Sequence, residues 1–132
     1  MPQSEPITNT VLALERAALD RWGKGDPGGY LDISAPDVTY FDPFVERRID
    51  GRNALRDWYE PFRGKIQIEW DEIINPHVNA IGDAALLTFQ FHSRGSEREM
   101  LWNCTEVYCR SEGEWKIVHS HWSFAKTPHM PA

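Results

Sequence analysis

The chain has 132 residues, enough for one domain with a real hydrophobic core, and we expect a single domain over residues 1–132. Its net charge of −6, from 20 acidic and 14 basic residues, gives no electrostatic reason to bind nucleic acid or an anionic membrane. Hydrophobic residues make up 41% of the chain and include six tryptophans, which argues against disorder and for a large apolar interior.

A stripe of apolar residues at helical spacing predicts a first helix over residues 6–22, which Gly23 ends. The stripe consists of Ile7, Val11, Leu14, Ala18 and Trp22. Asp26 and Pro27 then have the character of a helix cap and a first helical residue. They predict a second, short helix that ends near residues 34–36.

The next segment predicts a short strand and a third helix. Residues 37–42 alternate in polarity and form a strand that Pro43 ends. A charged loop is expected over residues 44–50, followed by a helix over residues 51–62. The buried side of this helix would carry Leu55, Trp58, Tyr59 and Phe62.

From Ile66 onward the hydrophobic period changes from 3.6 to 2 and predicts four long strands in hairpin order. Turns are expected at residues 79–83, 94–96 and 111–114, and the doublet Ile73-Ile74 suggests a bulge. Helices that precede a run of strands indicate an α+β fold.

In the last strand, each parity should line one face of the sheet. One set is Trp115, Ile117, His119, His121 and Ser123, and the other is Val118, Ser120, Trp122 and Phe124. Because neither set is purely polar, each face of the sheet needs a packing partner.

Cys104 and Cys109 are expected on opposite faces of one strand, ~16 Å apart and so too far apart to form a disulfide with each other. No apolar run approaches the ~18 residues of a membrane span, and residues 1–10 lack the features of a signal peptide. Reduced cysteines and the absence of these segments lead us to expect a cytoplasmic protein.

Two segments carry a family resemblance. INPHVNAIGDAA at residues 74–85 and GEWKIVHSHWS at residues 113–123 resemble the nuclear transport factor 2-like superfamily, in particular the association domain of calcium/calmodulin-dependent protein kinase II. The resemblance covers residues 7–125 and leaves residues 126–132 as a loose tail. It implies a cone: three N-terminal helices packed in a strongly curved, mainly antiparallel sheet, with a pocket at the open end and dimerisation through the outer face.

Members of this superfamily include steroid isomerases, SnoaL-type polyketide cyclases and dehydratases, and also proteins that only bind or assemble. Asp42, in the TYFDP segment, stands where the isomerases place the aspartate that moves a proton, and partial burial would make it a better base. The alternative is that Asp42 caps a turn before Pro43. The isomerase's two oxyanion donors match Ala18 and the neighbourhood of Thr105, so steroid isomerisation is not implied.

Glu106 is a further candidate. In the kinase domains, the residues that match Glu106 and Trp122 are arginines that bind small carboxylates, so that binding pocket is not expected here. A Glu106 that faces inward is a buried acid and needs a partner such as His77, Arg98 or Tyr108. A Glu106 that does not would form an ordinary cross-strand ion pair.

Histidines supply the remaining polar candidates. His77 matches a pocket histidine of the kinase domains and could act as base, acid or hydrogen-bond donor, or be structural at a strand bend. His119 and His121 form an HxH pair that could bind zinc, but no third ligand stands at a sensible spacing, so no metal is expected.

The pocket would be lined by aromatic residues. These are Trp22, Tyr30, Tyr40, Trp58, Tyr59, Phe62, Phe89, Trp102, Tyr108 and Trp122. Phosphate-loop, GxSxG and CxxC motifs do not occur in the sequence, so no cofactor is expected.

We therefore predict a cone that binds a small apolar molecule. It could be a cofactor-independent acid/base enzyme of isomerase, cyclase or dehydratase type, acting on a cyclic or polyketide-like substrate through Asp42, His77 and Glu106. The alternative is a non-catalytic ligand-binding or oligomerisation module. In both cases a homodimer through the outer sheet face is expected.

Overall fold

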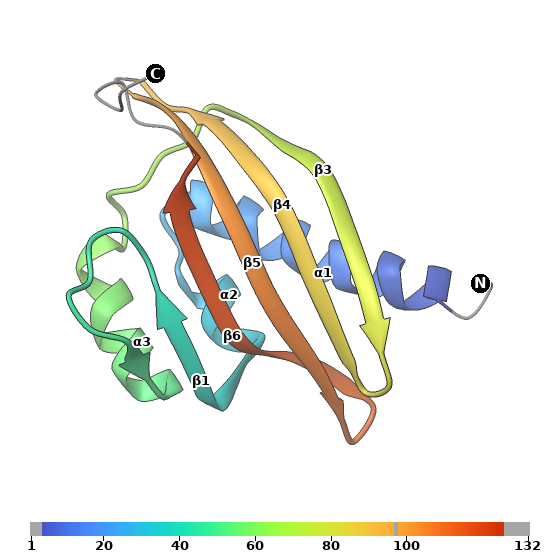
Figure 1. Ribbon diagram of the computed structural model, residues 1–132. Helices are drawn as coiled ribbons and strands as arrows, with labels where there is room; N and C mark the ends of the chain where they lie inside the picture. Colours follow the sequence, from blue (N-terminus) through green and yellow to red (C-terminus); the bar gives the residue numbers. More distant parts are fainter. Residues whose placement is uncertain (1–3, 97, 126–132) are drawn as a thin grey trace.

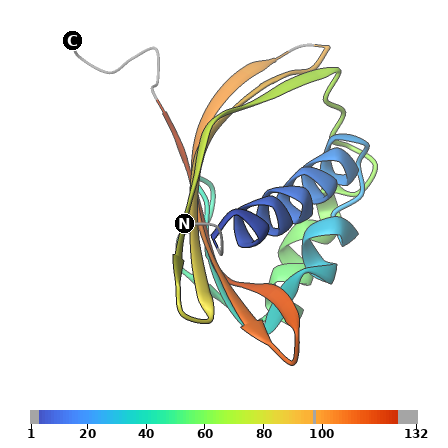
Figure 2. The same ribbon diagram turned by 90° about the vertical axis from the view of Figure 1, so that its right-hand side faces the viewer.

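A six-stranded sheet curves around three helices, all of which lie on its concave side (Figure 1 and Figure 2). This computed structural model describes residues 4–96 and 98–125, so the tail expected over residues 126–132 lies outside the described residues. The helices are α1 (Ser4–Gly23), α2 (Gly28–Asp32) and α3 (Arg52–Tyr59), and a 3-10 turn (Glu60–Phe62) follows α3. The predicted α+β cone is confirmed.

The strands are β1 (Ser34–Phe41), β2 (Ile49–Asp50), β3 (Trp70–Ile81), β4 (Ala84–Arg94), β5 (Glu99–Ser111) and β6 (Glu114–Phe124). They lie in the order β2-β1-β6-β5-β4-β3. The pairing is antiparallel except between β1 and β6, which run parallel. The four long hairpin strands thus form the body of the sheet, as predicted.

Several boundaries differ from the sequence prediction, and the first is α2, which ends at Asp32 instead of near residues 34–36. β3 does not begin at Ile66: the backbone N–H of Ile68 donates to the carbonyl of Gly23 at 2.9 Å, so this segment follows the end of α1 instead of pairing with β4. β1 begins at Ser34, three residues early, because Ser34 pairs with Ile117 of β6. The loop expected over residues 44–50 contains the short strand β2, which pairs with β1.

Alternation along β4 separates the two faces of the sheet. Leu87, Phe89 and Phe91 are buried on the concave side, where Val11 and Leu19 of α1 join the same core. Complete burial of a leucine such as Leu19 stabilises the fold by about 1.5–3 kcal/mol. The register of β3 against β4 shifts between Ile74 and His77, close to the predicted bulge.

A second bulge, in β6, overturns the predicted parity of that strand. Tyr108 of β5 pairs with Ile117 and Val107 pairs with His119, so Val118 is an extra residue in β6. Ile117 and Ser120 are therefore both buried on the concave side, although their parities differ.

The bulge also assigns the two histidines and the two cysteines of this region to faces. His119 and His121, opposite Val107 and Thr105, lie on the convex side. Cys104 is buried on the concave side, Cys109 is on the other face, and both thiols are free, as predicted. Of the helices formed by residues 4–96 and 98–125, none is long and apolar enough to cross a membrane.

Candidate functional site

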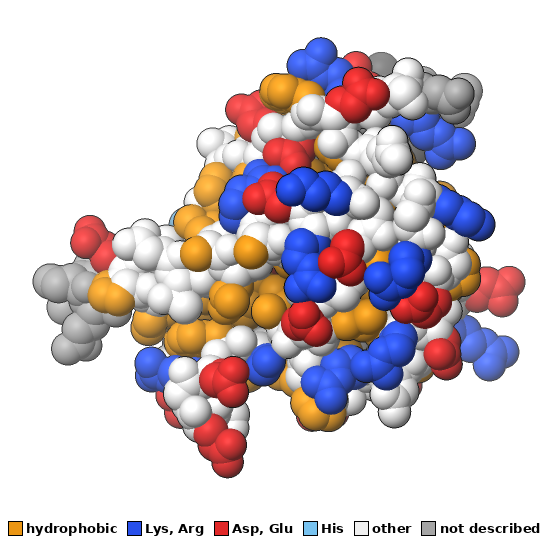
Figure 3. Space-filling model, turned by 180° about the vertical axis from the view of Figure 1, so that it is seen from behind, with side chains coloured by type: hydrophobic (Ala, Val, Ile, Leu, Met, Phe, Trp, Pro, Cys, Tyr) orange, Lys and Arg blue, Asp and Glu red, His pale blue; other side chains and the backbone are white. Residues whose placement is uncertain are grey.

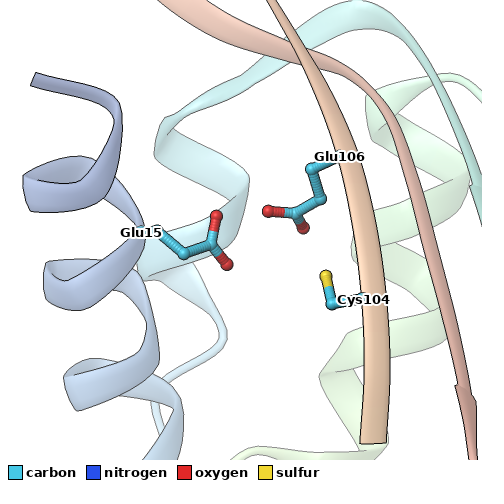
Figure 4. A group of neighbouring side chains, drawn as sticks. All are labelled: Glu15, Cys104 and Glu106. Carbon is cyan, nitrogen blue, oxygen red and sulfur yellow. The ribbon is translucent and has the colours of Figure 1, made fainter. Parts of the chain in front are cut away.

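Two carboxyl groups meet inside the cone. Glu15 extends from α1 and Glu106 from β5, and both side chains point toward each other with Cys104 beside them (Figure 4). Both glutamates are 0% exposed. One oxygen of each carboxyl group and the Sγ atom of Cys104 lie within 4.8 Å of one another. Two acids this deep in a core require hydrogen-bond donors, since unpaired buried charge is very costly.

Two tyrosines supply donors to Glu15. The Tyr30 hydroxyl donates to Oε2 of Glu15 at 2.5 Å and the Tyr108 hydroxyl donates to Oε1 at 2.6 Å. Burial, and secondarily the charge of Glu15, raise the pKa of both phenols well above the usual value, so both stay protonated and donate. Glu15 therefore has a hydrogen-bond donor on each of its carboxyl oxygens.

Glu106 is less well satisfied. The Ser120 hydroxyl donates to its Oε2 at 2.7 Å, and Nε1 of Trp122 donates to the Ser120 oxygen at 3.1 Å. Among the described residues, no donor reaches Oε1 of Glu106. Burial raises the pKa of Glu106 well above its usual value, and the nearby Glu15 raises it further. A protonated Glu106 avoids the repulsion of two adjacent charges, because one proton serves both groups.

The three groups Glu15, Cys104 and Glu106 also offer the donor atoms of a metal site. However, both oxygens of Glu15 already accept phenolic hydrogen bonds. Burial also raises the pKa of the Cys104 thiol, which holds it in the neutral form that binds metals poorly. The arrangement fits a shared proton better than a metal ion.

Asp42, at the end of β1, forms a second acidic centre. Its Oδ2 accepts from the Tyr40 hydroxyl at 2.8 Å and from Nε1 of Trp58 at 3.0 Å, and its Oδ1 accepts from the backbone N–H of Phe44 at 2.8 Å. Burial raises the pKa of Tyr59 well above its usual value, against the lowering effect of its hydrogen bond with Tyr40, and the nearby acidic groups raise it further. Tyr59 packs edge-to-face against Tyr40, the tyrosine that donates to Asp42.

The three predicted catalytic residues, Asp42, His77 and Glu106, do not all lie at one site. His77 lies on β3 with an exposed side chain, paired with Thr88 on the convex side, whereas Glu106 is buried on the concave side. Asp42 is connected to Trp58 and Tyr40, not to His77.

The expected partners of Glu106 were wrong. Glu106 bonds to Ser120 and faces Glu15, while Tyr108 bonds to Glu15 instead. Glu15 was missed although the sequence carries a signal: it stands four residues after Val11, on the apolar stripe of the first helix. Ser120 was missed because the bulge at Val118 is not visible in the sequence.

The aromatic residues predicted to line a pocket lie on the concave side and pack against one another. Trp122 makes edge-to-face contacts with Tyr30, Phe89 and Trp102 at 5.8–6.4 Å between ring centroids. Trp22 packs on Tyr59, and Phe62 packs on Trp58. The rings thus contact one another, and Tyr30 and Trp122 connect them to the pair of glutamates through Glu15 and Ser120.

An open hollow of about 220 Å³ lies elsewhere, between the end of α1 and the start of β3. Asp20, Lys24 and Trp70 are among the side chains that line it. Neither Glu106 nor Asp42 reaches it, so this hollow is separate from both acidic centres.

Residues 8–126 match the family model of the calcium/calmodulin dependent protein kinase II association domain. Among curated proteins, the calcium/calmodulin-dependent protein kinase type II subunit delta of Oryctolagus cuniculus is 27% identical over 125 residues, which are 89% of this chain and 24% of that protein. The chain thus spans about a quarter of the length of this relative.

Two solved structures show how widely the fold is used. A candidate ketosteroid isomerase from Parabacteroides distasonis is 37% identical, with a TM-score of 0.80 and coverage of 88% of this chain and 86% of that one. A nuclear transport factor 2-like protein of unknown function from Pseudomonas putida is 21% identical, with a TM-score of 0.81 and coverage of 94% and 98%. The chain therefore belongs to the calcium/calmodulin-dependent protein kinase II association-domain family, and it shares its fold with a nuclear transport factor 2-like protein.

Proposed function

We propose that this chain is a self-association domain that pairs with a second copy of itself through the convex face of its sheet. All three helices lie on the concave side, so the helices of the described residues leave the convex face open (Figure 2). Association is also the role named for the matching family model. A face that meets the same face of a second copy forms a closed, two-fold dimer.

The composition of the convex face is the observation that carries this proposal. Its centre, which we call the convex patch, carries no Lys, Arg, Asp or Glu. The patch consists of Thr39, Phe41, Leu86, Thr88, Asn103, Thr105, Val107, His119 and His121. Charged side chains, such as Arg94, Glu99 and Lys116, stand at its margin. Interface cores are depleted of charge in this way, while their rims are polar.

The helix side of the molecule differs in this respect. Lys and Arg side chains alternate there with Asp and Glu over the helices (Figure 3). Ion pairs such as Arg21–Asp26 and Arg63–Glu60 are partly exposed on these elements. This contrast favours the convex patch, and not the helix side, as the contact surface.

Sedimentation velocity over a range of protein concentrations tests the proposal. The wild type should form dimers or larger assemblies, and Val107→Arg should sediment as a monomer, because it buries an unpaired charge at the centre of the patch. Ala17→Arg, on the exposed side of α1, is the matched control and should associate like the wild type. A monomeric wild type, or a Val107→Arg variant that still associates, would contradict the proposal.

A second function is supported by the Oε1 atom of Glu106, to which no donor among the described residues is bonded. A neutral, buried carboxylic acid is a strong donor toward an oxygen atom of a ligand, and it can also transfer a proton. The surrounding rings would select a small apolar molecule, and Asp42 is the candidate base at the second centre. The similarity to a candidate ketosteroid isomerase supports acid/base chemistry of this general kind, without a cofactor.

A panel of enolisable ketones and phenols tests this second function by thermal shift and turnover. Any compound bound by the acid pair should lose affinity in Glu106→Gln, and turnover should fall in Asp42→Asn. Glu46→Gln, at an exposed loop position, is the control and should match the wild type. Equal binding in Glu106→Gln and the wild type would remove Glu106 from the site.

A further inference from the structure

Two histidines lie side by side within the convex patch. The rings of His119 and His121 are 6.3 Å apart between centroids and nearly perpendicular, at 86°. Phe41 of β1 packs against both rings, at 6.0 Å and 5.1 Å. The Thr39 hydroxyl lies 2.7 Å from Nδ1 of His119, which fixes the orientation of that ring. Both imidazoles are thus held in one part of the proposed contact surface.

The side chains that the two adjacent strands place next to these imidazoles are uncharged. β1 presents Thr39 and Phe41 to them and β5 presents Thr105 and Val107, none of which carries a charge. Burial lowers the pKa of His119, and the neighbouring His121 and Arg48 lower it further, while Thr39 acts in the opposite direction.

One carboxylate, that of Asp50, stands on this face near the histidines, and it is already paired with an arginine. Asp50 of β2 pairs with Thr39 across the strands, and its Oδ1 accepts from the Arg48 guanidinium at 2.6 Å. Among the described residues that pair with β6 at this point, no acidic side chain stands opposite His119 or His121. A proton added to His119 therefore lies near the cationic Arg48 and gains no carboxylate partner.

We propose that protonation of His119 and His121 separates the two copies, so that self-association is lost as the pH falls from about 7.5 to about 5.5. This inference rests on the self-association proposed above. When two copies pair about a two-fold axis, the four imidazoles are removed from water together with the rest of the patch. Cationic rings would repel one another there and would lose hydration, so the dimer holds fewer protons than the two separate chains.

The direction and size of the effect follow from this proton balance. A state that binds fewer protons is favoured as the pH rises and disfavoured as it falls. Because a two-fold dimer holds two copies of His119, the factor by which protonation of one ring weakens pairing is squared in the dimer dissociation constant.

Sedimentation equilibrium of the whole chain at about pH 7.5 and about pH 5.5 tests the inference. The wild type should bind itself at least about tenfold more weakly at the lower pH. The double variant His119→Gln/His121→Gln should keep the same dissociation constant at both. His92→Gln is the matched control, because His92 stands at the margin of the same face and bonds to Glu99 at 2.6 Å, and it should behave like the wild type.

The possible outcomes distinguish the role of the two histidines from self-association itself. A wild type that associates equally at both pH values overturns the role of the histidines and leaves self-association intact. A double variant that still dissociates at the lower pH also overturns it, since another group must then be responsible. A wild type that is monomeric at both pH values overturns both proposals.

Discussion

The two faces of this sheet handle ionisable groups in opposite ways. The concave face buries two carboxyl groups and surrounds Glu15 with tyrosine donors. The convex face keeps permanent charge out of its centre and carries two histidines there. Both surfaces are built by the same strands, since Glu106 points inward and its neighbours Thr105 and Val107 point outward.

This difference shows what a buried acid requires. On the concave side, α1 brings the Glu15 carboxyl group to within hydrogen-bond reach of Tyr108 on β5, and α2 brings the Tyr30 hydroxyl to Glu15, so a charge or a shared proton can be stabilised. On the convex side, the described residues place no second layer against the sheet. Substitutions on the concave face should therefore change folding stability, and substitutions on the convex face should change association.

The largest effect is expected for Glu15→Ala. The change leaves the hydroxyls of Tyr30 and Tyr108 without their acceptor and opens a cavity in the core, so the free energy of unfolding should fall by about 3–5 kcal/mol. Urea unfolding measures this loss. Glu5→Ala, exposed in the first turn of the same helix, is the control and should stay close to the wild type. A small loss in Glu15→Ala would mean that the acid pair does not anchor α1.

A smaller effect is expected for Tyr108→Phe, which removes one donor to Glu15 and keeps the ring. The free energy of unfolding should fall by about 1–2 kcal/mol, because Oε1 of Glu15 then lacks a partner. Tyr30→Phe should behave in the same way at Oε2. If both variants matched the wild type in urea unfolding, the hydroxyls would not be needed to hold the charge.

Glu106→Gln tests the concave face through the pH dependence of the free energy of unfolding. Because the pKa of Glu106 is raised in the folded state, the wild type binds more protons when folded than when unfolded. Its contribution to stability is therefore present below the unfolded pKa of about 4.5 and is lost as the pH rises toward the folded pKa.

An amide does not titrate, so the stability of Glu106→Gln relative to the wild type should increase by about 1 kcal/mol or more between pH 5 and pH 8. Urea unfolding at several pH values measures this difference. A difference that stays constant over this range would show that Glu106 is not the group that holds the proton.

The smallest effect on stability is expected on the convex face. Thr105→Lys, at an exposed position of β5, should change the free energy of unfolding by less than about 0.5 kcal/mol. The same change should weaken self-association, because it adds a charge to the convex patch. Urea unfolding and sedimentation velocity on one sample give both readings. A stability loss comparable with that of Tyr108→Phe would contradict the division between the faces.

Much of the fold could be predicted from hydrophobic spacing and from two short segments. The stripe from Ile7 to Trp22 was sufficient to predict α1, and the change to a period of 2 predicted the long hairpin strands. These features are local, since the apolar period of a helix or a strand depends on neighbours a few residues away. Part of the candidate site was equally accessible, because Glu106 stands mid-strand between Thr105 and Val107 at a position that the family resemblance assigns to a pocket.

Which side chains meet, and on which face of the sheet they lie, depends on the tertiary structure and could not be predicted from the sequence. The meeting of Glu15 with Glu106 depends on how α1 lies across β5, and no local pattern encodes that placement. One extra residue, Val118, shifts the pairing of β6, turns Ser120 toward Glu106 and leaves His119 on the convex face. A bulge reverses the alternation of a strand from that point on, so a sequence with period 2 alone cannot reveal on which face its later side chains lie.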